Sequence, residues 1–393
     1  MRNGVNFFGP YEAQDSIGRV ASLNIDCLRV ANIPHHAYKL SRPAPRQNLD
    51  YATIDDKLLS LLEHKINLFH FNARRVPLYF SRLGEDSLKG FYNIGFWVHE
   101  MQTIPNQWAR QLEFFNEIWT PSSLCHSAVS LSANIPVLKI PYPIESNPIS
   151  SRVLARMSGR EFPVLNFVAV FDVASDAERK NPLFTVRAFL EAHDRNSSVK
   201  LILKTKNLGH DPKLQETLLK IAAQHQNVQI LDGYMEPVDL AALYDEMDVC
   251  VSLHRAEGFG LTLSDAMSRG IPVLTTGYSG NMDFCNGAES RLVSYELREV
   301  GHSRPRYKSD DLWAEPDMDD AVQAFRDVFN DHGIWLKRAL KARSRVDRDF
   351  SVTSVGKLMR DRLNLIAGNF VFPDDMTGRS IDVEVGICDT YGF

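Results

Sequence analysis

The stretch SLHRAEGFGLTLSDAMSRGIPVL (Ser252–Leu274) decides the fold of the second half of the chain. It predicts the end of a strand, a glycine loop, a helix that begins near Leu261, a turn and a further strand. The residues just before it, 248–253, form a short apolar run of the kind that a buried parallel strand needs. Gly258 and Gly260 allow the loop backbone to approach a ligand closely. The N–H groups at the start of the helix point into the same space and favour an anion, typically a phosphate.

Two carboxylates accompany this predicted phosphate site. Glu257 lies in the loop and Asp265 lies early in the helix, where both can accept hydrogen bonds from hydroxyl groups. A phosphate beside a polyol describes a nucleotide sugar. The simpler interpretation is a loop acid and a first-turn acid that the helix dipole favours.

The whole string resembles the retaining glycosyltransferases of family 4. Their signature is a Glu, seven residues and a second Glu, within a pattern of the form S-x-H-R-x-E-G-F-G-L. The match extends into TGYSGNMDF (Thr276–Phe284). The resemblance implies that Glu257 lies by the donor sugar and that the second acid holds the ribose hydroxyls. Here the second acid is Asp265, one methylene shorter than Glu, which affects the ribose contact only.

Apolar runs alternate with amphipathic stretches along the chain, and this predicts a doubly wound α/β fold. The resemblance implies the GT-B arrangement, in which two Rossmann-like domains face each other across a cleft. Prolines near residues 134–144 resist both helix and central strand, so we place the domain boundary near residue 150. We expect an acceptor-binding domain at 1–150, a nucleotide-sugar-binding domain at 151–352, and at 353–393 a helix that returns to the first domain, followed by a tail.

Individual elements follow from the same patterns. Residues 16–20 predict a glycine turn that opens a helix, and residues 351–363 predict the returning helix. The final 24 residues, 370–393, carry no readable pattern. Strands are expected at 4–8, 66–71, 91–98, 117–121, 163–172, 200–204 and 228–231.

Arg179 and Lys180 stand before Asn-Pro at a predicted helix start. Two cations there can neutralise a diphosphate leaving group beside the helix end, and the surrounding string resembles the phosphate-binding loop of the family. A solvated surface pair is the simpler alternative. Lys204 and Lys206, expected just past a strand end, are further candidates for the same phosphates.

The resemblance assigns other donor contacts. Gly233 and Tyr234 stand where the loop of the family meets the nucleotide base, although an ordinary turn also explains them. Gly18 and Arg19 resemble the glycine-rich first turn under the donor. The loop and helix start that lie against the donor are Gly258, Phe259, Gly260 and Leu261.

His99 follows a predicted strand of the first domain. Its position resembles that of the His of the family that hydrogen-bonds a hydroxyl of the donor sugar, with Glu100 as the neighbouring alternative. A structural histidine is the competing interpretation. Trp97, Trp108 and Phe114 nearby fit a core better than a sugar-stacking surface.

We expect neither a metal nor a cofactor besides the donor. Glycosyl transfer develops positive charge on the sugar and negative charge on the departing diphosphate, which Arg179, Lys180 and the helix amides can stabilise. No D-x-D motif lies at a convincing strand end: Asp317-Met-Asp319 is expected in a polar, acidic loop. The catalytic set is therefore expected to be Glu257, His99, Arg179 and Lys180.

Composition bears on partners and location. The net charge of −5 argues against a nucleic-acid partner. Five widely spaced cysteines without a C-x-x-C pair fit a reducing compartment. No apolar run is long enough to span a bilayer, and the N-terminus lacks the apolar segment of a signal peptide. We expect a cytoplasmic protein, with peripheral contact to the inner face of the cell membrane as the form of membrane association that the sequence allows.

The sequence alone leaves the substrates open. The donor is expected to be GDP- or UDP-linked. The resemblance implies a mannose-like hexose as the sugar, and as the acceptor a glycan or a lipid-linked oligosaccharide of surface-polysaccharide or lipopolysaccharide assembly.

Two other classes of protein compete with a glycosyltransferase. A dinucleotide-dependent oxidoreductase would need G-x-G-x-x-G after its first strand, and the sequence near Gly9 does not supply it. A non-catalytic glycan- or nucleotide-binding protein on a GT-B scaffold would have lost the phosphate cations, whereas Arg179 and Lys180 are present.

Overall fold

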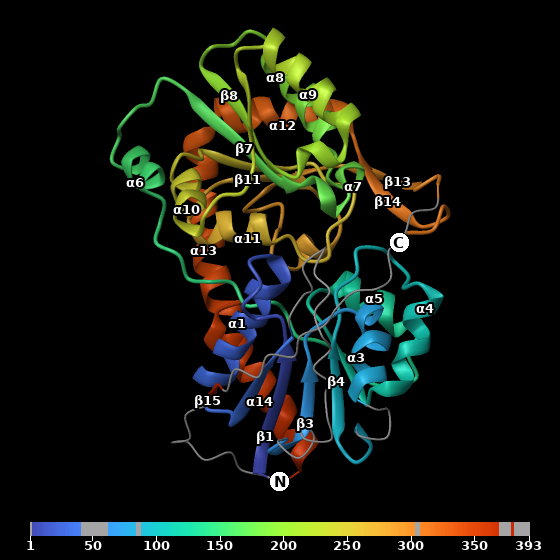
Figure 1. The fold of residues 1–393 in the computed structure, drawn as a ribbon. Coiled ribbons are helices and arrows are strands. Elements are labelled where there is room, and N and C mark those ends of the chain that lie inside the picture. The colour runs from blue at the N-terminus through green and yellow to red at the C-terminus, as the bar shows by residue number, and fades with distance from the viewer. Residues whose placement is uncertain (1, 41–61, 84–87, 303–306, 369–378, 381–393) are drawn as a thin grey trace. The chain divides into compact units, whose positions relative to one another are not determined.

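The computed structural model describes residues 2–40, 62–83, 88–302, 307–368 and 379–380. It divides the chain into two compact units. Unit 1 is Met1–Pro143 with Asp349–Phe393, and unit 2 is Ile144–Arg348. Each unit is an α/β layer structure around one parallel sheet (Figure 1).

The sheet of unit 1 is parallel throughout, in the order β15-β2-β1-β3-β4-β5-β6. Phe7 and Phe8 face opposite ways along β1: Phe7 stacks on His70, and Phe8 stacks between Tyr38 and Phe69. Both faces of the sheet are therefore buried, as a parallel sheet requires. The strands are β1 (Arg2–Gly9), β2 (His35–Lys39), β3 (His64–Phe69), β4 (Tyr92–Phe96), β5 (Glu117–Thr120), β6 (Val137–Lys139) and β15 (Arg379–Ser380).

The four strands predicted in this unit are confirmed, while β2, β6 and β15 were not foreseen; among the described strands, β6 pairs with β5 alone, at the edge of the sheet. β2 has the sequence HHAYK and is buried along most of its length. Its polar residues do not form the apolar run that predicts a buried strand. β15 is only two residues long, and its neighbours in the tail lie outside the described residues. The Trp97–Trp108 cluster is core, since both side chains pack in the apolar interior of unit 1.

The helices of unit 1 include one from the far end of the chain. They are α1 (Ser16–Val30), α3 (Val76–Leu83), α4 (Asn106–Ala109), α5 (Ser123–Ser130) and α14 (Val352–Ala367), with the 3₁₀ turns η1 (Ala73–Arg75) and η3 (Arg110–Phe114). α14 packs closely on α1 at Gly356. A Cβ at this position would lie 2.6 Å from the carbonyl oxygen of Cys27, so only glycine fits. Arg362 of α14 also forms an ion pair with the buried Glu117 of β5. The predicted helix at 351–363 is thus present, and it belongs to unit 1.

The prediction of a glycine turn at 16–20 is wrong. These residues form the first turn of α1, and Asp15 caps the helix by accepting hydrogen bonds from the N–H groups of Ile17 and Gly18. Gly18 therefore lies inside the helix and not in the turn before it. It is a glycine because a Cβ there would lie 2.0 Å from the carbonyl oxygen of Ala13.

Unit 2 holds a second parallel sheet, in the order β12-β11-β10-β7-β8-β9. Its strands are β7 (Leu165–Asp172), β8 (Val199–Lys206), β9 (Val228–Asp232), β10 (Val249–Ser252), β11 (Val273–Thr276) and β12 (Arg291–Val293). The strand order reverses between β7 and β10. In open α/β sheets a ligand crevice lies at the carboxyl ends of the strands beside such a switch point.

The structure describes eight α-helices in unit 2. They are α6 (Ser151–Met157), α7 (Ala177–Lys180), α8 (Pro182–His193), α9 (Pro212–Gln224), α10 (Pro237–Asp245), α11 (Leu261–Ser268), α12 (Met318–Asn330) and α13 (His332–Asp349), with three 3₁₀ turns, η4 (Val173–Ser175), η5 (Leu208–His210) and η6 (Gly280–Asp283). Phe167, Phe189 and Phe325 join β7, α8 and α12 through ring contacts of 5.1–6.0 Å.

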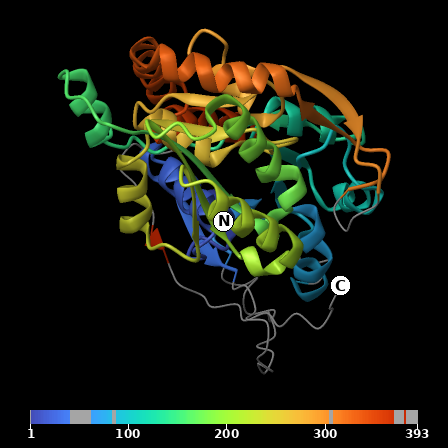
Figure 2. The same cartoon turned by 90° about the horizontal axis from the view of Figure 1, so that it is seen from above.

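A separate antiparallel hairpin, β13 (Tyr295–Glu299) with β14 (Leu312–Pro316), extends away from the sheet of unit 2 (Figures 1 and 2). Four described cysteines, Cys27, Cys125, Cys250 and Cys285, are buried free thiols, and Cys388 lies outside the described residues. No helix in the described part of the chain is long and apolar enough to cross a bilayer.

Candidate functional site

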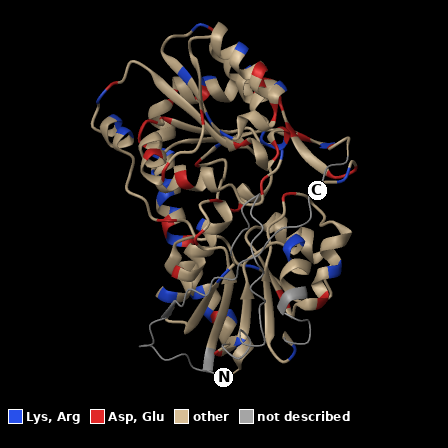
Figure 3. Ribbon diagram, in the orientation of Figure 1, with Lys and Arg blue, Asp and Glu red and all other residues tan. Residues whose placement is uncertain are grey.

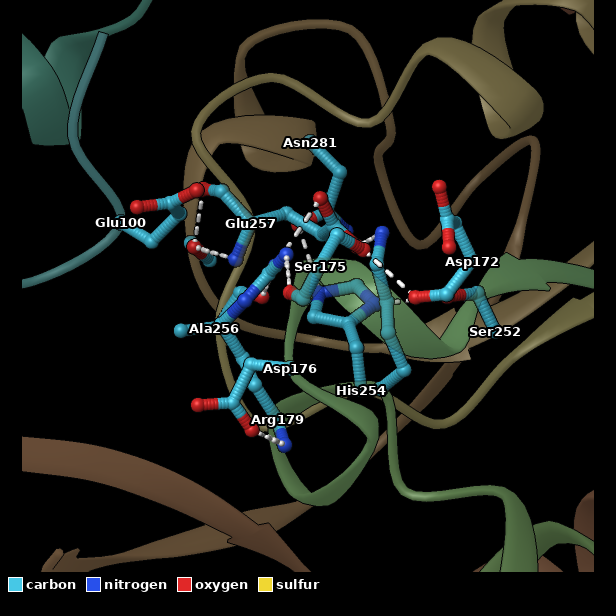
Figure 4. A network of polar contacts seen from close by, with 12 residues as sticks. Glu100, Asp172, Ser175, Asp176, Arg179, Ser252, His254, Ala256, Glu257 and Asn281 are labelled. Carbon is cyan, nitrogen blue, oxygen red and sulfur yellow. Dashed lines mark hydrogen bonds and ion pairs between the residues drawn. The ribbon is translucent and has the colours of Figure 1, made fainter. Parts of the chain in front are cut away.

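Loops from β7, β10 and β11 meet at the carboxyl edge of the unit 2 sheet. The loop after β7 carries Arg179, the loop after β10 carries Glu257, and the loop after β11 carries Asn281 (Figure 4). The strand order reverses between β7 and β10, so the residues that follow these two strands lie on either side of the switch point. The strand, loop and helix predicted around Glu257 are confirmed, and α11 begins at Leu261.

Unusual backbone conformations shape the loop after β7. Asp176 has φ of +79° and its carboxylate accepts a hydrogen bond from the N–H of Arg179. Asn181 has φ of +57°, which ends α7 and lets α8 begin at Pro182. Left-handed backbone at a non-glycine residue is costly and concentrates at functional sites. Here it places Arg179 and Lys180 together at the end of α7.

Arg179 is buried and joins the two loops. Its guanidinium donates to the carbonyl oxygen of Ala256 at 2.5 Å and to that of Ser175 at 3.0 Å. The Arg179 carbonyl in turn accepts the backbone N–H of Arg255 at 2.8 Å. The simple surface-pair interpretation of Arg179 and Lys180 is therefore wrong for Arg179.

Glu257 sits against both cations. Lys180 Nζ donates a hydrogen bond to Glu257 Oε1, and Arg179 Nη1 lies 3.3 Å from Glu257 Oε2. Burial raises the pKa of Glu257, but the positive charges of Lys180 and Arg179 outweigh it and lower the pKa to about 2. The carboxylate is therefore ionised at neutral pH.

The backbone of Glu257 is fixed by the loop after β11. Its N–H donates to Ser279 Oγ at 2.6 Å, and its carbonyl oxygen accepts the N–H of Gly280 at 2.9 Å. A Cβ at Gly280 would lie 2.2 Å from the carbonyl oxygen of Gly258. The two loops touch at backbone level, so no side chain fits between them.

His254 lies beneath this loop and is fully buried. Its Nε2 lies 3.1 Å from the carbonyl oxygen of Tyr278 and 3.2 Å from Asn281 Oδ1, while its Nδ1 lies 2.9 Å from Ser252 Oγ. Burial lowers the pKa of His254, so the ring is neutral. Two acceptors at Nε2 place the proton there, and Ser252 then donates to Nδ1. Figure 4 shows this chain of contacts.

The glycine loop has the predicted form, but Phe259 is buried beside Phe284. Gly260 has φ of +100° and caps α11 without a side-chain hydrogen bond, which leaves the first amides of α11 unpaired by a cap. Phe259 is buried, with its ring centroid 5.0 Å from that of Phe284, so it anchors the loop from below. Asp265 is buried midway along α11, near enough to Cys250 to raise the pKa of that thiol together with burial, the larger effect.

The two lysines of β8 differ from each other. Both lie within β8, and not past its end as predicted, because pairing with β7 continues to Lys206. The Lys204 ammonium donates to the carbonyl oxygens of Thr205 at 2.8 Å and Leu231 at 3.4 Å, and also to that of Gly233. Lys206 instead lies over the ring of Tyr234, 5.5 Å from its centroid. Tyr234 is exposed, and Gly233 has φ of +120°.

The remaining predicted residues belong to unit 1. Gly18 and Arg19 lie in the first turn of α1. His99 follows β4 in a loop, with its Nε2 2.9 Å from the carbonyl oxygen of Thr103 and its ring centroid 5.0 Å from that of Trp108. Its Nδ1 lies 4.0 Å from a carboxylate oxygen of Glu100.

Several residues that shape the site were not singled out from the sequence. Ser252, His254, Ser279 and Asn281 fix the loop of Glu257, and all four lie within the two strings quoted for the resemblance. Small polar residues beside glycines in those strings were the available signal. Arg255 also contributes, since it donates to both carboxylate oxygens of Glu315 and to the carbonyl oxygen of Glu178. Among the described residues, no group of three or more His, Cys, Asp or Glu is arranged to hold a metal ion.

Comparisons with known proteins identify the family and the fold. A family model described as "Family 4 Glycosyltransferase in conflict systems" matches residues 136–355. No curated protein shows a significant sequence match. HepE of Anabaena, solved with UDP and glucose, is similar over 93% of this chain and 100% of its own, with a TM-score of 0.67 and 12% identity.

Two further solved structures are similar. A glycosyltransferase from Rickettsia africae covers 94% of this chain and 100% of its own, with a TM-score of 0.67 and 12% identity. The pneumococcal O-GlcNAc transferase GtfA, solved with UDP and GlcNAc, is similar over 79% of this chain and 59% of its own, with a TM-score of 0.57 and 14% identity. At such identities the likeness concerns the fold alone, and it confirms the predicted GT-B class.

Proposed function

The chain belongs to the family 4 glycosyltransferases of conflict systems, whose model spans more than half of it, and on that premise we propose that it transfers a hexose from a nucleoside-diphosphate sugar to a glycan or lipid-linked glycan, with retention of anomeric configuration. The observation that carries the proposal is the meeting of Arg179, Lys180 and Glu257 beside the start of α11, which no side chain caps. This places two cations and helix amides next to an ionised carboxylate at the edge where a ligand is expected.

The proposed chemistry follows from these charges. Breaking the glycosidic bond leaves negative charge on the diphosphate, and Lys180, Arg179 and the amides near Leu261 would stabilise it. The ionised Glu257 would lie by the sugar, where positive charge develops. Asp265 would hold the ribose hydroxyls, and Tyr234 beside Lys206 would meet the base.

Lys180 makes the cation pair responsive to the donor. Its ammonium is bonded to Glu257 in the structure. A diphosphate offers it a second, doubly charged partner, so we expect Lys180 to be shared between the carboxylate and the departing phosphate. Arg179 is tied to two backbone carbonyls and is expected to hold its place.

For the donor, UDP-linked hexoses are the first choice, because HepE and GtfA were solved with UDP together with glucose or GlcNAc. GDP-linked mannose, which the family resemblance favours, is the second. The acceptor is proposed to be a glycan or lipid-linked oligosaccharide in surface-polysaccharide assembly, which would bring the protein to the cytoplasmic face of the membrane. His99 is proposed to bind a hydroxyl of the donor sugar.

The test is nucleotide release and product formation from UDP-glucose, UDP-GlcNAc and GDP-mannose, followed by NMR, with and without EDTA. We expect turnover of one donor class that survives EDTA, with the anomeric configuration retained. Loss of activity in EDTA, restored by manganese or magnesium, would contradict the role of the cations in place of a metal. Binding of these nucleotide sugars without any turnover would favour a non-catalytic binding protein instead.

A further inference from the structure

Helix α13 buries one face and exposes the opposite face over four turns. Its buried residues recur at intervals of one helical turn, as expected for an amphipathic helix: Trp335, Leu336, Ala339, Ala342 and Val346. A stripe of exposed residues on the opposite side of the helix follows the same period. We call this stripe the α13 face: Ile334, Lys337, Lys341, Ser344 and Arg348. Gly333 and Asp349, at the two ends of the helix, are also exposed but lie to either side of this stripe.

The α13 face carries three cations and no carboxylate. Its successive members are three or four residues apart, so they are neighbours on the helix surface, and Lys337 to Arg348 span about 16 Å at 1.5 Å per residue. Neither Lys337 nor Lys341 forms an ion pair with a residue in the described part of the chain. Asp347, the acid within this stretch, lies off the face and pairs with Arg343 at 3.2 Å. Figure 3 shows several basic positions in succession along α13.

Exposed apolar side chains accompany these cations. Ile334, at the start of the α13 face, is 51% exposed. Leu154 and Met157 of α6 are 50% and 53% exposed. α6 and the start of α13 meet at Asp248, whose carboxylate pairs with Arg152 and Arg156 of α6 and whose carbonyl oxygen accepts a hydrogen bond from His332.

The combination of exposed cations and exposed apolar side chains favours an anionic bilayer over a nucleic acid as the partner. The phosphates of a nucleic acid engage cations but give exposed isoleucine, leucine and methionine nothing to bury against. A bilayer surface takes both, since apolar side chains enter the boundary between head groups and acyl chains while lysines reach the phosphates. The sequence pI of 6.2 also lacks the general basic character of nucleic-acid-binding domains.

We propose that the α13 face docks unit 2 on the anionic surface of a lipid bilayer. Each lysine or arginine near such a surface strengthens binding roughly fivefold, so three cations give a reversible attachment that salt weakens. The attachment depends on exposed residues outside the nucleotide site, and it does not require that the protein transfer a sugar.

The test is sedimentation of the full chain with vesicles of phosphatidylcholine, with or without phosphatidylglycerol. We expect binding only when phosphatidylglycerol is present, and release at high salt. Reversing two charges in K337E/K341E should weaken binding roughly thirtyfold or more. The matched control is K213E/K220E, which makes the same charge change on the exposed face of α9 and should bind as the wild type does.

Both variants should melt as the wild type does and bind UDP equally, which separates this result from a failure of the proposed function. The docking proposal is overturned if the wild type ignores phosphatidylglycerol, if K337E/K341E binds as well as the wild type, or if both variants lose binding equally. Binding of a single-stranded oligonucleotide that K337E/K341E abolishes, without vesicle binding, would overturn it in favour of a nucleic-acid partner.

Discussion

Lys180 Nζ donates a hydrogen bond to Glu257 Oε1, which joins two loops 77 residues apart in the sequence. The loop of Lys180 follows β7 and the loop of Glu257 follows β10, the strands on either side of the switch point. The charge that neutralises the cations proposed to bind phosphate is therefore the carboxylate proposed to face the sugar. This sharing of charge leads to the predictions below.

Glu257→Gln should lower turnover by roughly a hundredfold, because a preorganised charge beside the reacting sugar is lost. The affinity for UDP should not fall, since removal of the carboxylate leaves both cations to the phosphates. Donor turnover and UDP calorimetry on the same preparation check this split, with thermal melting as the control for folding. A near-normal rate would remove Glu257 from the reaction.

Arg179→Ala should destabilise the protein more than Lys180→Ala. Arg179 is buried and satisfies two backbone carbonyls besides Glu257, so its loss should cost about 1–3 kcal/mol of unfolding free energy. Lys180 forms an ion pair with the carboxylate of Glu257, and Arg179 still compensates that charge in the variant. Urea unfolding of the two variants measures the difference, and a larger loss in Lys180→Ala would be inconsistent with this assignment.

The pH dependence of the free energy of unfolding should show how strongly Lys180 and Arg179 stabilise the ionised Glu257. The folded pKa of Glu257 is about 2, below its ordinary value of 4.5. A carboxylate with a lowered pKa adds stability that is complete above pH 4.5 and is lost as the pH falls toward 2, here on the order of 3 kcal/mol. The stability gap between the wild type and Glu257→Gln should therefore narrow over that window. Denaturant titrations at several pH values test this, and a constant gap would mean that Glu257 is not stabilised by its cations.

Gly280→Ala should damage the site, because the new Cβ would lie 2.2 Å from the carbonyl oxygen of Gly258. Backbone cannot yield there without moving the loop of Glu257, so both stability and UDP affinity should fall. Gly287→Ala is the matched control, since the nearest atom to its Cβ is a leucine methyl at 3.9 Å. Equal behaviour of the two variants would show that the loops are not in close contact.

The local part of the site could be predicted from the sequence, and the reason is physical. The β10–α11–β11 unit is encoded within Ser252–Leu274 by an apolar run, two glycines and a helical period, all of which act over short distances. Glu257, Gly258 and Gly260 could thus be placed on their loop. Four of the unit 1 strands and the helix at Val352–Ala367 followed from the same kind of pattern.

What the sequence did not yield depends on distant contacts. Lys204 and Lys206 have the same residue type and similar positions, yet backbone carbonyls from β9 and its loop hold Lys204 while Lys206 lies over Tyr234. Gly18 looked like a turn residue, although packing against Ala13 within a helix is what requires a glycine there. The bond from Lys180 to Glu257 likewise has no local signal. Each of these outcomes was decided by a chain segment far from the residue or by packing that no periodicity encodes.

The most direct test of the central claim, that Lys180 belongs to a diphosphate site beside Glu257, is calorimetric titration of UDP into the wild type, Lys180→Ala and Lys204→Met. The wild type should bind, and Lys180→Ala should lose about 1–3 kcal/mol of binding free energy through a lost charge-assisted bond. Lys204→Met should keep its affinity once folded, because that ammonium is occupied by backbone carbonyls. Normal affinity in Lys180→Ala with loss in Lys204→Met would move the diphosphate to β8, and an absence of binding by the wild type would contradict the account.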